Sequence, residues 1–416
     1  MSLTGRRALR KSDVREANQR LLLSIIRASA GISRADIART TGLSPSSVTF
    51  IVNRILRAGL VTEASSEDHA RVGRRPLALR LRPESLIAAG VEITGSGARV
   101  AVADLEGRFL KQRTVPLHPD YHVFLARVRE AIRSLTRSIS STRLLGVGVS
   151  LFGTIDRATG RVVAAENLGW FDIDVGRILS QGLPTPIHFD NDARLCALAE
   201  RWFCEPGSKP LENFVFLVLR KGLGTGVVIE GRLLYGASGA ASEFGHTSLY
   251  PDGRRCVCGG VGCWEEYASQ RALERLYAER CVASSRHPVP AVEEIIRLAR
   301  NGDPIALDAL RVTATHLGMG LANLNWVFNP EVIVVGDYLA SAWDLMGNWV
   351  WEALRGHAPH RYLTRLRIIP SRHGRDSALK GALALVFSHY FTEHAEYRQQ
   401  HYHSTVPSQS MAAAPL

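Results

Sequence analysis

Three cysteines and one histidine lie close enough together in this sequence to bind a single metal ion. Cys256, Cys258 and Cys263 fall within CVCGGVGC, and His246 precedes them in SEFGH. Thiolates and imidazole suit zinc, and four protein ligands complete the tetrahedral coordination of a structural site. We therefore predict a structural zinc site. The alternative is a set of buried or redox-active cysteines beside an ordinary core histidine.

A second group of polar residues follows an apolar strand. In PIHFDNDARLCALAERWF (186–203), Asp190, Asn191 and Asp192 stand where a strand runs into a helix. Ligands of α/β sheets bind at such strand ends. Carboxylate and amide oxygens there can bind sugar hydroxyls, and an aspartate can act as a general base toward one of them. A helix cap, the simpler alternative, accounts for one acid but not for three polar residues in a row.

Length and composition indicate a large folded protein. The chain has 416 residues, 46% of them hydrophobic, which is enough for two or three domain cores. We expect the other cysteines, Cys196, Cys204 and Cys281, to lie in these cores because their surroundings are apolar and helical in pattern. The sequence shows neither a signal-like N-terminus nor an apolar run of about 20 residues, so we expect a cytoplasmic protein without a membrane partner.

Positive charge is concentrated near the N-terminus. Residues 1–90 contain 16 Lys and Arg against 7 Asp and Glu, whereas the whole chain has a net charge of +12. This distribution predicts a polyanionic partner for the N-terminal region, nucleic acid before membrane. A merely arginine-rich surface is the alternative.

The same region has the pattern of a helix-turn-helix. Residues 14–29 carry apolar side chains at helical spacing. Ser33 can cap a following short helix that ends at Thr41-Gly42, and Ser44 can cap a second one with Pro45 at its first position. Two short helices joined by a glycine turn form a helix-turn-helix.

The second short helix has one apolar and one polar face. Val48, Ile51, Val52 and Ile55 recur at helical spacing and are expected to pack inward. Phe50 projects outward among hydroxyl and amide side chains, which suit base edges and phosphates. On this face we predict DNA contacts by Ser46, Ser47, Thr49, Asn53 and Arg54.

Two short strand patterns after this helix predict a wing. LVTE and LALRLR (77–82) flank the loop ASSEDHARVGRRP. Arg71, Arg74 and Arg75 at its tip could enter a minor groove, where negative potential is concentrated. Helix-turn-helix units also dock proteins, but the arginine-rich tip favours DNA.

The rest of the chain contains an internal repeat. GVEITGSGARVAVADLEGRFL (90–110) and LVLRKGLGTGVVIEGRLL (217–234) share the order strand, glycine-rich turn, strand, turn, strand. The repeat predicts two similar α/β halves whose turn amides face a shared cleft able to hold phosphate. We place the DNA-binding domain at 1–83, the body at 84–396 with a zinc loop at 246–263, and a disordered tail at 397–416.

These segments together resemble the ROK family of repressors and sugar kinases, and the resemblance covers nearly the whole chain. CVCGGVGCWE is similar to the family signature CxCGxxGCxE, SEFGH to its ExGH motif, and NDA to its catalytic Asn-Asp. NLNWVFNPEVIVVGD (323–337) is similar to its Asn-Pro-Glu strand. The resemblance implies the winged helix-turn-helix of the repressor branch followed by an actin-like, two-lobed α/β sugar-kinase fold.

The resemblance also implies roles for individual residues. It assigns zinc to His246, Cys256, Cys258 and Cys263, as structural support for a ligand site rather than as a participant in chemistry. Asp192 matches the catalytic base of the family's kinases. The residues implied to face a sugar are Asn167, Asn191, Asp192, Glu243, His246 and Glu265.

The phosphate-binding turns depart from those of the family's kinases. EITGS (92–96) replaces DxGGT, and Arg220-Lys221-Gly222 replaces Gly-Thr-Gly. In the third turn, Asp337 and Tyr338 add a carboxylate and a ring that we expect to oppose nucleotide entry. Phosphoryl transfer depends on positioning and charge, so we expect these changes to abolish most catalysis. Lys221 could bind a phosphate, which leaves a sugar phosphate conceivable as ligand.

The sequence therefore predicts a sugar-responsive DNA-binding transcriptional regulator, of repressor type, that is not an enzyme. The first alternative is a ROK-type ATP-dependent sugar kinase with an appended DNA-binding domain. The second is an RNA- or protein-binding scaffold with a vestigial sugar fold. The expected partners are a double-stranded operator, a sugar or sugar phosphate, and further copies of the chain in a homodimer or homotetramer, because operator symmetry requires at least a dimer.

Overall fold

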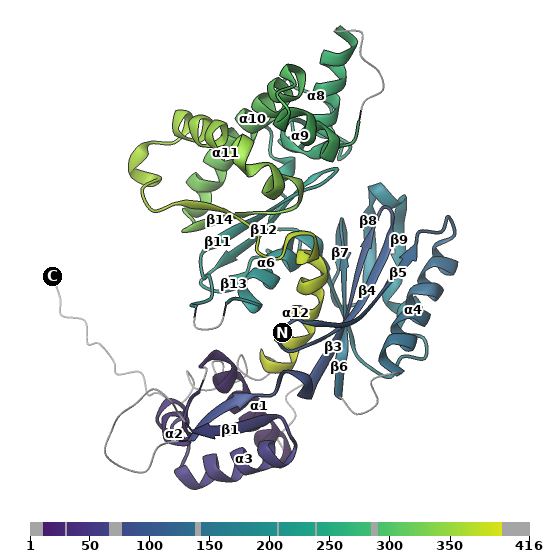
Figure 1. Ribbon diagram of the computed structural model, residues 1–416. Helices are drawn as coiled ribbons and strands as arrows, with labels where there is room; N and C mark the ends of the chain where they lie inside the picture. Colours follow the sequence, from purple (N-terminus) through teal and green to yellow (C-terminus); the bar gives the residue numbers. More distant parts are fainter. Residues whose placement is uncertain are drawn as a thin grey trace, which may run out of the picture.

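An N-terminal domain and two lobes make up the computed structural model (Figure 1). The structure describes residues 11–29, 31–65, 77–137, 143–205, 208–237, 239–283 and 290–392. The predicted tail at 397–416 lies outside these ranges. Within them, no helix has the length and apolar character needed to cross a lipid bilayer.

The N-terminal domain has the elements that the sequence predicts. These are α1 (Lys11–Ala28), α2 (Arg34–Thr41), α3 (Pro45–Arg57) and the antiparallel strands β1 (Val61–Ser65) and β2 (Leu77–Leu81). The ladder from Val61 opposite Leu81 to Ser65 opposite Leu77 forms the base of a wing. Residues 66–76, which include its predicted tip, lie outside the described residues.

Capping residues fix the two helices of the helix-turn-helix. Ser33 accepts a hydrogen bond from the Asp36 backbone N–H and completes a capping box, and Gly42 ends α2 with a φ of 69°. Ser44 caps α3, with proline at its first turn. The helix-turn-helix prediction is therefore confirmed in its local chemistry.

The first lobe contains a five-stranded sheet in the order β10-β6-β3-β4-β5. The strands are β3 (Leu86–Thr94), β4 (Gly97–Asp104), β5 (Phe109–Pro116), β6 (Arg143–Leu151) and β10 (Ile187–Asn191). Helix α4 (Tyr121–Arg137) packs on β4 and β5. A small sheet of β7 (Thr154–Asp156), β8 (Arg161–Ala165) and β9 (Trp170–Asp174) lies beside it, followed by α5 (Val175–Ser180).

The second lobe repeats this topology. Its sheet has the order β13-β12-β11-β14-β15, with β11 (Phe214–Leu219), β12 (Leu223–Ile229), β13 (Arg232–Leu233), β14 (Val332–Val335) and β15 (Arg367–Pro370). In both sheets an antiparallel meander of three strands continues into two parallel strands. The predicted internal repeat is thus confirmed, because the two glycine-rich turns join β3 to β4 and β11 to β12.

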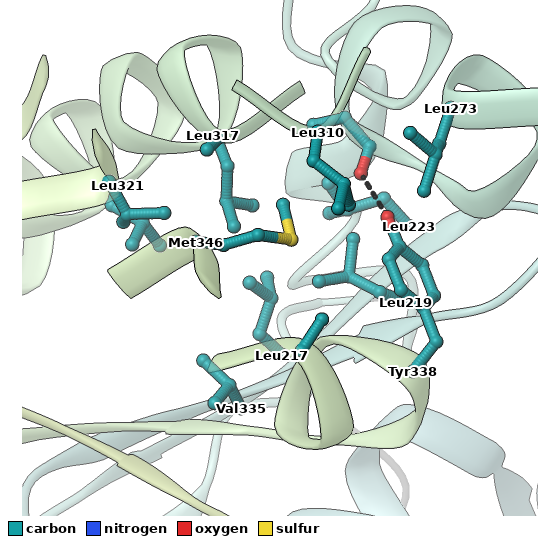
Figure 2. Close-up of a cluster of buried hydrophobic side chains, with 14 of the residues drawn as sticks. Leu217, Leu219, Leu223, Leu273, Leu310, Leu317, Leu321, Val335, Tyr338 and Met346 are labelled. Atoms are coloured by element: carbon teal, nitrogen blue, oxygen red, sulfur yellow. Dashed lines mark hydrogen bonds between the residues drawn. The ribbon is translucent and has the colours of Figure 1, made fainter. Parts of the chain in front are cut away.

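Helices cover one face of the sheet in the second lobe. They are α7 (Glu265–Ala268), α8 (Gln270–Ala283), α9 (Val292–Arg300), α10 (Pro304–Phe328) and α11 (Asp337–His357). Their apolar faces pack with β11 and β14 in a core of leucines around Met346 (Figure 2). This core holds the turns at the ends of β11 and β14 in fixed positions.

Two helices connect the lobes and the N-terminal domain. Helix α6 (Asp192–Trp202) packs against β11 and β12 on one side and against α12 (Ser377–Thr392) on the other. The approach is close, since a Cβ on Gly381 of α12 would lie 2.0 Å from the Leu195 carbonyl oxygen. Phe387 and Phe391 of α12 share a core with Leu22 of α1, and Figure 1 shows α12 running from the lobes to the N-terminal domain.

The isolated cysteines differ in burial. Cys196 and Cys281 are buried, as expected. Cys204 is only half-buried, so the expectation was wrong for this residue. The reason is that α6 already ends at Trp202, which leaves Cys204 in the connection that follows.

Candidate functional site

The cysteines and the histidine predicted to bind zinc converge at one point. The candidate ligand atoms of His246, Cys256, Cys258 and Cys263 all lie within 4.8 Å of one another. The sulfurs of Cys258 and Cys263 are 3.7 Å apart, as are the Cys256 sulfur and His246 Nδ1. Two thiolates bound at about 2.3 Å to one tetrahedral zinc lie about 3.8 Å apart, so the four residues fit such an ion.

The six residues predicted to face a sugar line one cavity. It has a volume of about 430 Å³ and walls from both lobes, within the range usual for small-ligand sites. The turn of β3 and β4 contributes Thr94 to Ser96, and the turn of β11 and β12 contributes Arg220 to Gly224. The predicted residues in its wall are Asn167, Asn191, Asp192, Glu243, His246 and Glu265.

The three polar residues after β10 have separate structural roles. Asp190 is fully buried and binds Arg194 at 2.8 Å and Arg157 at 3.1 Å. Asn191, rather than either aspartate, caps α6 by accepting hydrogen bonds from the backbone N–H groups of residues 193 and 194. Of the two aspartates, Asp192 is therefore the one that presents a carboxylate to the cavity, and its Oδ1 also accepts a hydrogen bond of 2.9 Å from the Ala193 N–H.

Glu265 links the cysteine loop to a phosphate turn. Its Oε2 accepts a hydrogen bond of 3.3 Å from the Leu223 N–H, and its Oε1 lies 3.8 Å from His246 Nδ1. The Cys256 thiol donates to the same Oε1 at 2.9 Å. A metal bound at the cysteines would take up the Cys256 thiolate and remove this donor, so Glu265 would then be held in the cavity wall by the Leu223 N–H and by Arg271, whose Nη2 lies 3.5 Å from Oε1.

Arg220 occupies the centre of the three phosphate turns. It donates from Nη2 to Glu92 Oε1 at 3.1 Å, from Nη1 to Asp192 Oδ2 at 3.2 Å, and from Nε to Asp337 Oδ1 at 3.1 Å. Glu92 lies in β3 and Asp192 follows β10, both strands of the first lobe, whereas Arg220 and Asp337 belong to the second. These ion pairs, which we call the Arg220 cluster, join the two lobes.

Burial controls the charges of the Arg220 cluster. It raises the pKa of Glu92 against the opposing effects of Arg220 and Arg99, and it raises the pKa of Asp192 against Arg220. Burial also disfavours the charge of Arg220, but Asp337, Asp192 and Glu92 together raise its pKa above the ordinary value. The guanidinium therefore remains charged and holds all three carboxylates.

The third phosphate turn differs from expectation in one respect. The Tyr338 ring does not face the nucleotide region, so that prediction was wrong. The ring is buried in the leucine core, where its hydroxyl donates to the Ala268 carbonyl oxygen at 3.2 Å (Figure 2). Asp337 alone points to the phosphate turns, from a left-handed backbone conformation with a φ of 51°.

The predicted DNA-contacting face lies on α3. Val48, Ile51, Val52 and Ile55 are buried beneath it. Ser46, Ser47, Thr49 and Arg54 are exposed, and Asn53 is half-buried. Sequence reasoning missed Arg34, whose Nη1 donates to Asn53 Oδ1 at 3.0 Å and fixes that carboxamide. The predicted wing residues Arg71, Arg74 and Arg75 belong to the undescribed stretch 66–76.

The comparisons with known proteins cover both parts of the chain. The ROK family profile matches residues 88–389, and the MarR family profile matches residues 16–72. The xylose repressor of Bacillus subtilis is 27% identical over 91% of this chain and 96% of its own length. The Escherichia coli DNA-binding transcriptional dual regulator NagC is 27% identical over 90% of this chain and 93% of its own length.

Solved structures agree on the fold. A ROK family transcriptional regulator, a homologue of the E. coli MLC protein, superposes with a TM-score of 0.78 at 24% identity, over 92% of this chain and 98% of its own. A ROK family glucokinase from Streptomyces griseus, in complex with glucose and AMPPNP, has a TM-score of 0.64 at 28% identity, over 72% of this chain and 98% of its own. The N-terminal domain is thus a MarR-type winged helix, the two lobes have the actin-like sugar-kinase fold, and the chain belongs to the ROK family.

Proposed function

We propose that this chain is a cytoplasmic DNA-binding transcriptional regulator, of repressor type, whose body binds a sugar or sugar phosphate. The observation that carries the proposal is the Arg220 cluster, of which Arg220 and Asp192 line the ligand cavity. If the cavity binds a sugar but does not admit the phosphates of ATP, sugar binding must act through something other than phosphoryl transfer. Control of DNA binding by the winged helix is such an effect.

The Arg220 cluster opposes kinase chemistry in two ways. A general base must be able to accept the proton of the attacking hydroxyl, but Oδ2 of Asp192 is bound to Arg220. The phosphate turns must also admit Mg-ATP, but the guanidinium stands among them at 3.1–3.2 Å from three carboxylates. We accordingly expect sugar binding without phosphorylation.

The names of the relatives support both halves of the proposal. Xylose repressor and N-acetylglucosamine repressor describe proteins that match nearly the full length of this chain. Xylose, N-acetylglucosamine, other monosaccharides and their phosphates therefore form the panel for a thermal-shift screen. A ligand at about 100 times its dissociation constant should add about 2.7 kcal/mol to the free energy of unfolding. Operator selection from random duplex DNA tests the DNA-binding half of the proposal. A chain that selects no sequence would contradict it.

The second candidate function is an ATP-dependent sugar kinase, favoured by the presence of Asp192 in the cavity wall. We predict that the purified chain, with Mg-ATP and each sugar of the panel, forms ADP no faster than without sugar. The assay is a coupled ADP measurement with a ROK glucokinase as positive control. Sugar-dependent ADP formation that disappears in Asp192→Asn would establish the kinase instead.

We further propose that zinc occupies the site formed by His246, Cys256, Cys258 and Cys263. Structural zinc contributes about 10 kcal/mol to the folding of small peptides and less in a large domain. Cys258 is the exposed cysteine of the set, so its replacement removes a ligand with little loss of packing. We expect Cys258→Ser to lose the metal and to melt at a lower temperature. Elemental analysis of the parent that finds well under one zinc per chain would reject this site. Cys204→Ser, which lies outside the cluster, is the matched control and should keep its metal.

The oligomeric state follows from the proposed operator. Repressors with a helix-turn-helix bind half-sites that are related by twofold symmetry. We therefore propose a homodimer or a homotetramer, which a light-scattering mass measurement distinguishes.

A further inference from the structure

Phe50 is an apolar side chain on the face of α3 that is proposed to contact DNA. Its exposed fraction is 62%, whereas Val48, Ile51 and Val52 around it on the helix are buried. Burying a phenylalanine side chain stabilises a protein by roughly 1.5–3 kcal/mol. A partner that buries this exposed ring would therefore gain a large favourable contribution to its binding free energy.

Phe50 lies in the N-terminal half of α3, which is the recognition helix of the helix-turn-helix. Side chains on a helix lean toward its N-terminus, so the ring of Phe50 extends over the turn that begins at Pro45. The N-terminal residues of a recognition helix are those that reach base edges. The hydroxyls of this turn are already bonded to one another, with Ser44 Oγ 2.8 Å from Ser47 Oγ and 3.0 Å from Ser46 Oγ.

The surroundings of Phe50 suit a polyanion. Helix α3 contains no acidic residue, and Arg54 and Arg57 stand exposed in its last turns. Within the described residues neither arginine forms an ion pair. Two positive charges beside an apolar ring fit a duplex, where phosphates flank the base edges of the groove.

Base chemistry then restricts what the ring can recognise. In the major groove adenine, guanine and cytosine present hydrogen-bonding groups, and thymine alone adds an apolar group, its 5-methyl. A phenyl ring has no conventional hydrogen-bonding group and gains most from an apolar contact. We propose that Phe50 is a specificity-determining residue that recognises thymine in the operator through the 5-methyl group. This inference rests on the proposed function as a DNA-binding regulator.

The test removes the methyl group and leaves base pairing intact. An operator is first selected from random duplexes with the full chain. Each thymine is then replaced singly by deoxyuridine, and affinity is measured at one salt concentration. Because burial of one methyl or methylene is worth about 0.8 kcal/mol, the parent should lose affinity about fourfold at the contacted thymine. Other thymines should change little.

Substitution of the ring completes a double-mutant cycle. Phe50→Ser should bind the thymine and deoxyuridine operators equally, because the partner of the methyl group is gone. Leu77→Ser is the matched control, since Leu77 is an exposed apolar residue of the same domain, at the base of the wing. It should keep the fourfold preference. Thermal melting should show that both variants fold, because both side chains are exposed.

Each contrary outcome has a distinct meaning. If every thymine can be replaced without loss in the parent, Phe50 does not read a methyl group and the inference is wrong. If Phe50→Ser weakens binding but keeps the preference for thymine, the ring contacts another group, such as a protein partner or a base step. A chain that selects no operator overturns the proposed function and this inference together.

Discussion

Replacing Arg220 with glutamine is expected to lower the free energy of unfolding by about 3–5 kcal/mol at pH 7, because removal of one partner leaves buried carboxylates uncompensated. Glu92 and Asp192 are 3% and 8% exposed, so water cannot replace the lost guanidinium. Glu92 would keep Arg99, at 3.4 Å, whereas the Oδ2 of Asp192 would lose its ion pair. Chemical denaturation of parent and variant measures the difference.

The loss of stability in Arg220→Gln should depend on pH. In the parent, burial raises the pKa of Glu92 and of Asp192 above their unfolded values, so the folded state binds more protons and both groups cost stability as pH rises. Without Arg220 both pKa values should rise further. The difference between parent and variant should therefore be small below about pH 4, the range of the unfolded pKa values, because both folded proteins then hold these carboxyls in the protonated form, and it should grow toward neutrality.

Two further variants separate this effect from a general loss of charge. Arg161 pairs with Asp172 on the surface, where the two side chains are 49% and 70% exposed. Arg161→Gln should leave the free energy of unfolding close to that of the parent, because solvent-exposed ion pairs contribute little. Adding Glu92→Gln to Arg220→Gln should recover part of the loss, because it removes one of the uncompensated carboxylates. A deficit in Arg220→Gln that stays the same from pH 4 to pH 7 would contradict a role in charge compensation.

Local sequence signals predicted the elements and the positions of the candidate ligands. The cysteine spacing and SEFGH indicated a metal cluster, and the four side chains do converge. The capping residues Ser33 and Ser44 indicated where α2 and α3 begin. The two glycine-rich turns indicated two similar lobes with a cavity between them. All of these signals act over short stretches of chain, where propensity, caps and turn chemistry decide the structure.

Contacts between distant segments could not be predicted in this way. Arg220, Glu92 and Asp337 each indicated a lost phosphate contact, but nothing in the sequence indicated that they bind one another across 117 and 128 residues. The position of Tyr338 depends on a core formed by α8, α10 and α11, so the direction of its side chain could not be predicted from the sequence either. The same holds for the core shared by α12 and the winged helix, which joins residues from the two ends of the described chain.

That shared core suggests how a sugar could affect DNA binding. Helix α6 begins at Asp192 in the cavity wall and ends at Trp202. The guanidinium of Arg27, on α1 of the winged helix, lies 3.6 Å from the centre of the Trp202 ring. Because Trp202 also packs with Phe387 and Phe391 of α12, one rigid helix extends from the ligand site to the DNA-binding domain.

We therefore expect the best sugar from the screen to change operator affinity about tenfold, a coupling of about 1.4 kcal/mol. Coupling is reciprocal, so operator DNA must change the affinity for that sugar by the same factor. Asp192→Asn should still fold and bind the operator but should lose the sugar response, because an amide donor replaces one carboxylate acceptor. Operator titrations with and without sugar, at one salt concentration, measure both effects.

Arg27→Gln should uncouple the two sites while each still binds its own ligand. A cation–π contact contributes about 0.5–2 kcal/mol, which is comparable to the whole expected coupling, so its loss should bring the sugar response close to onefold. Arg15→Gln is the matched control, because it removes the same charge from an exposed position of α1 and should keep the tenfold response. If Arg27→Gln responds to sugar like the parent, the coupling does not pass through the contact of α6 with α1. If a tightly bound sugar leaves operator affinity unchanged in the parent, the chain is not a sugar-switched regulator, and phosphorylation of that sugar becomes the activity to measure.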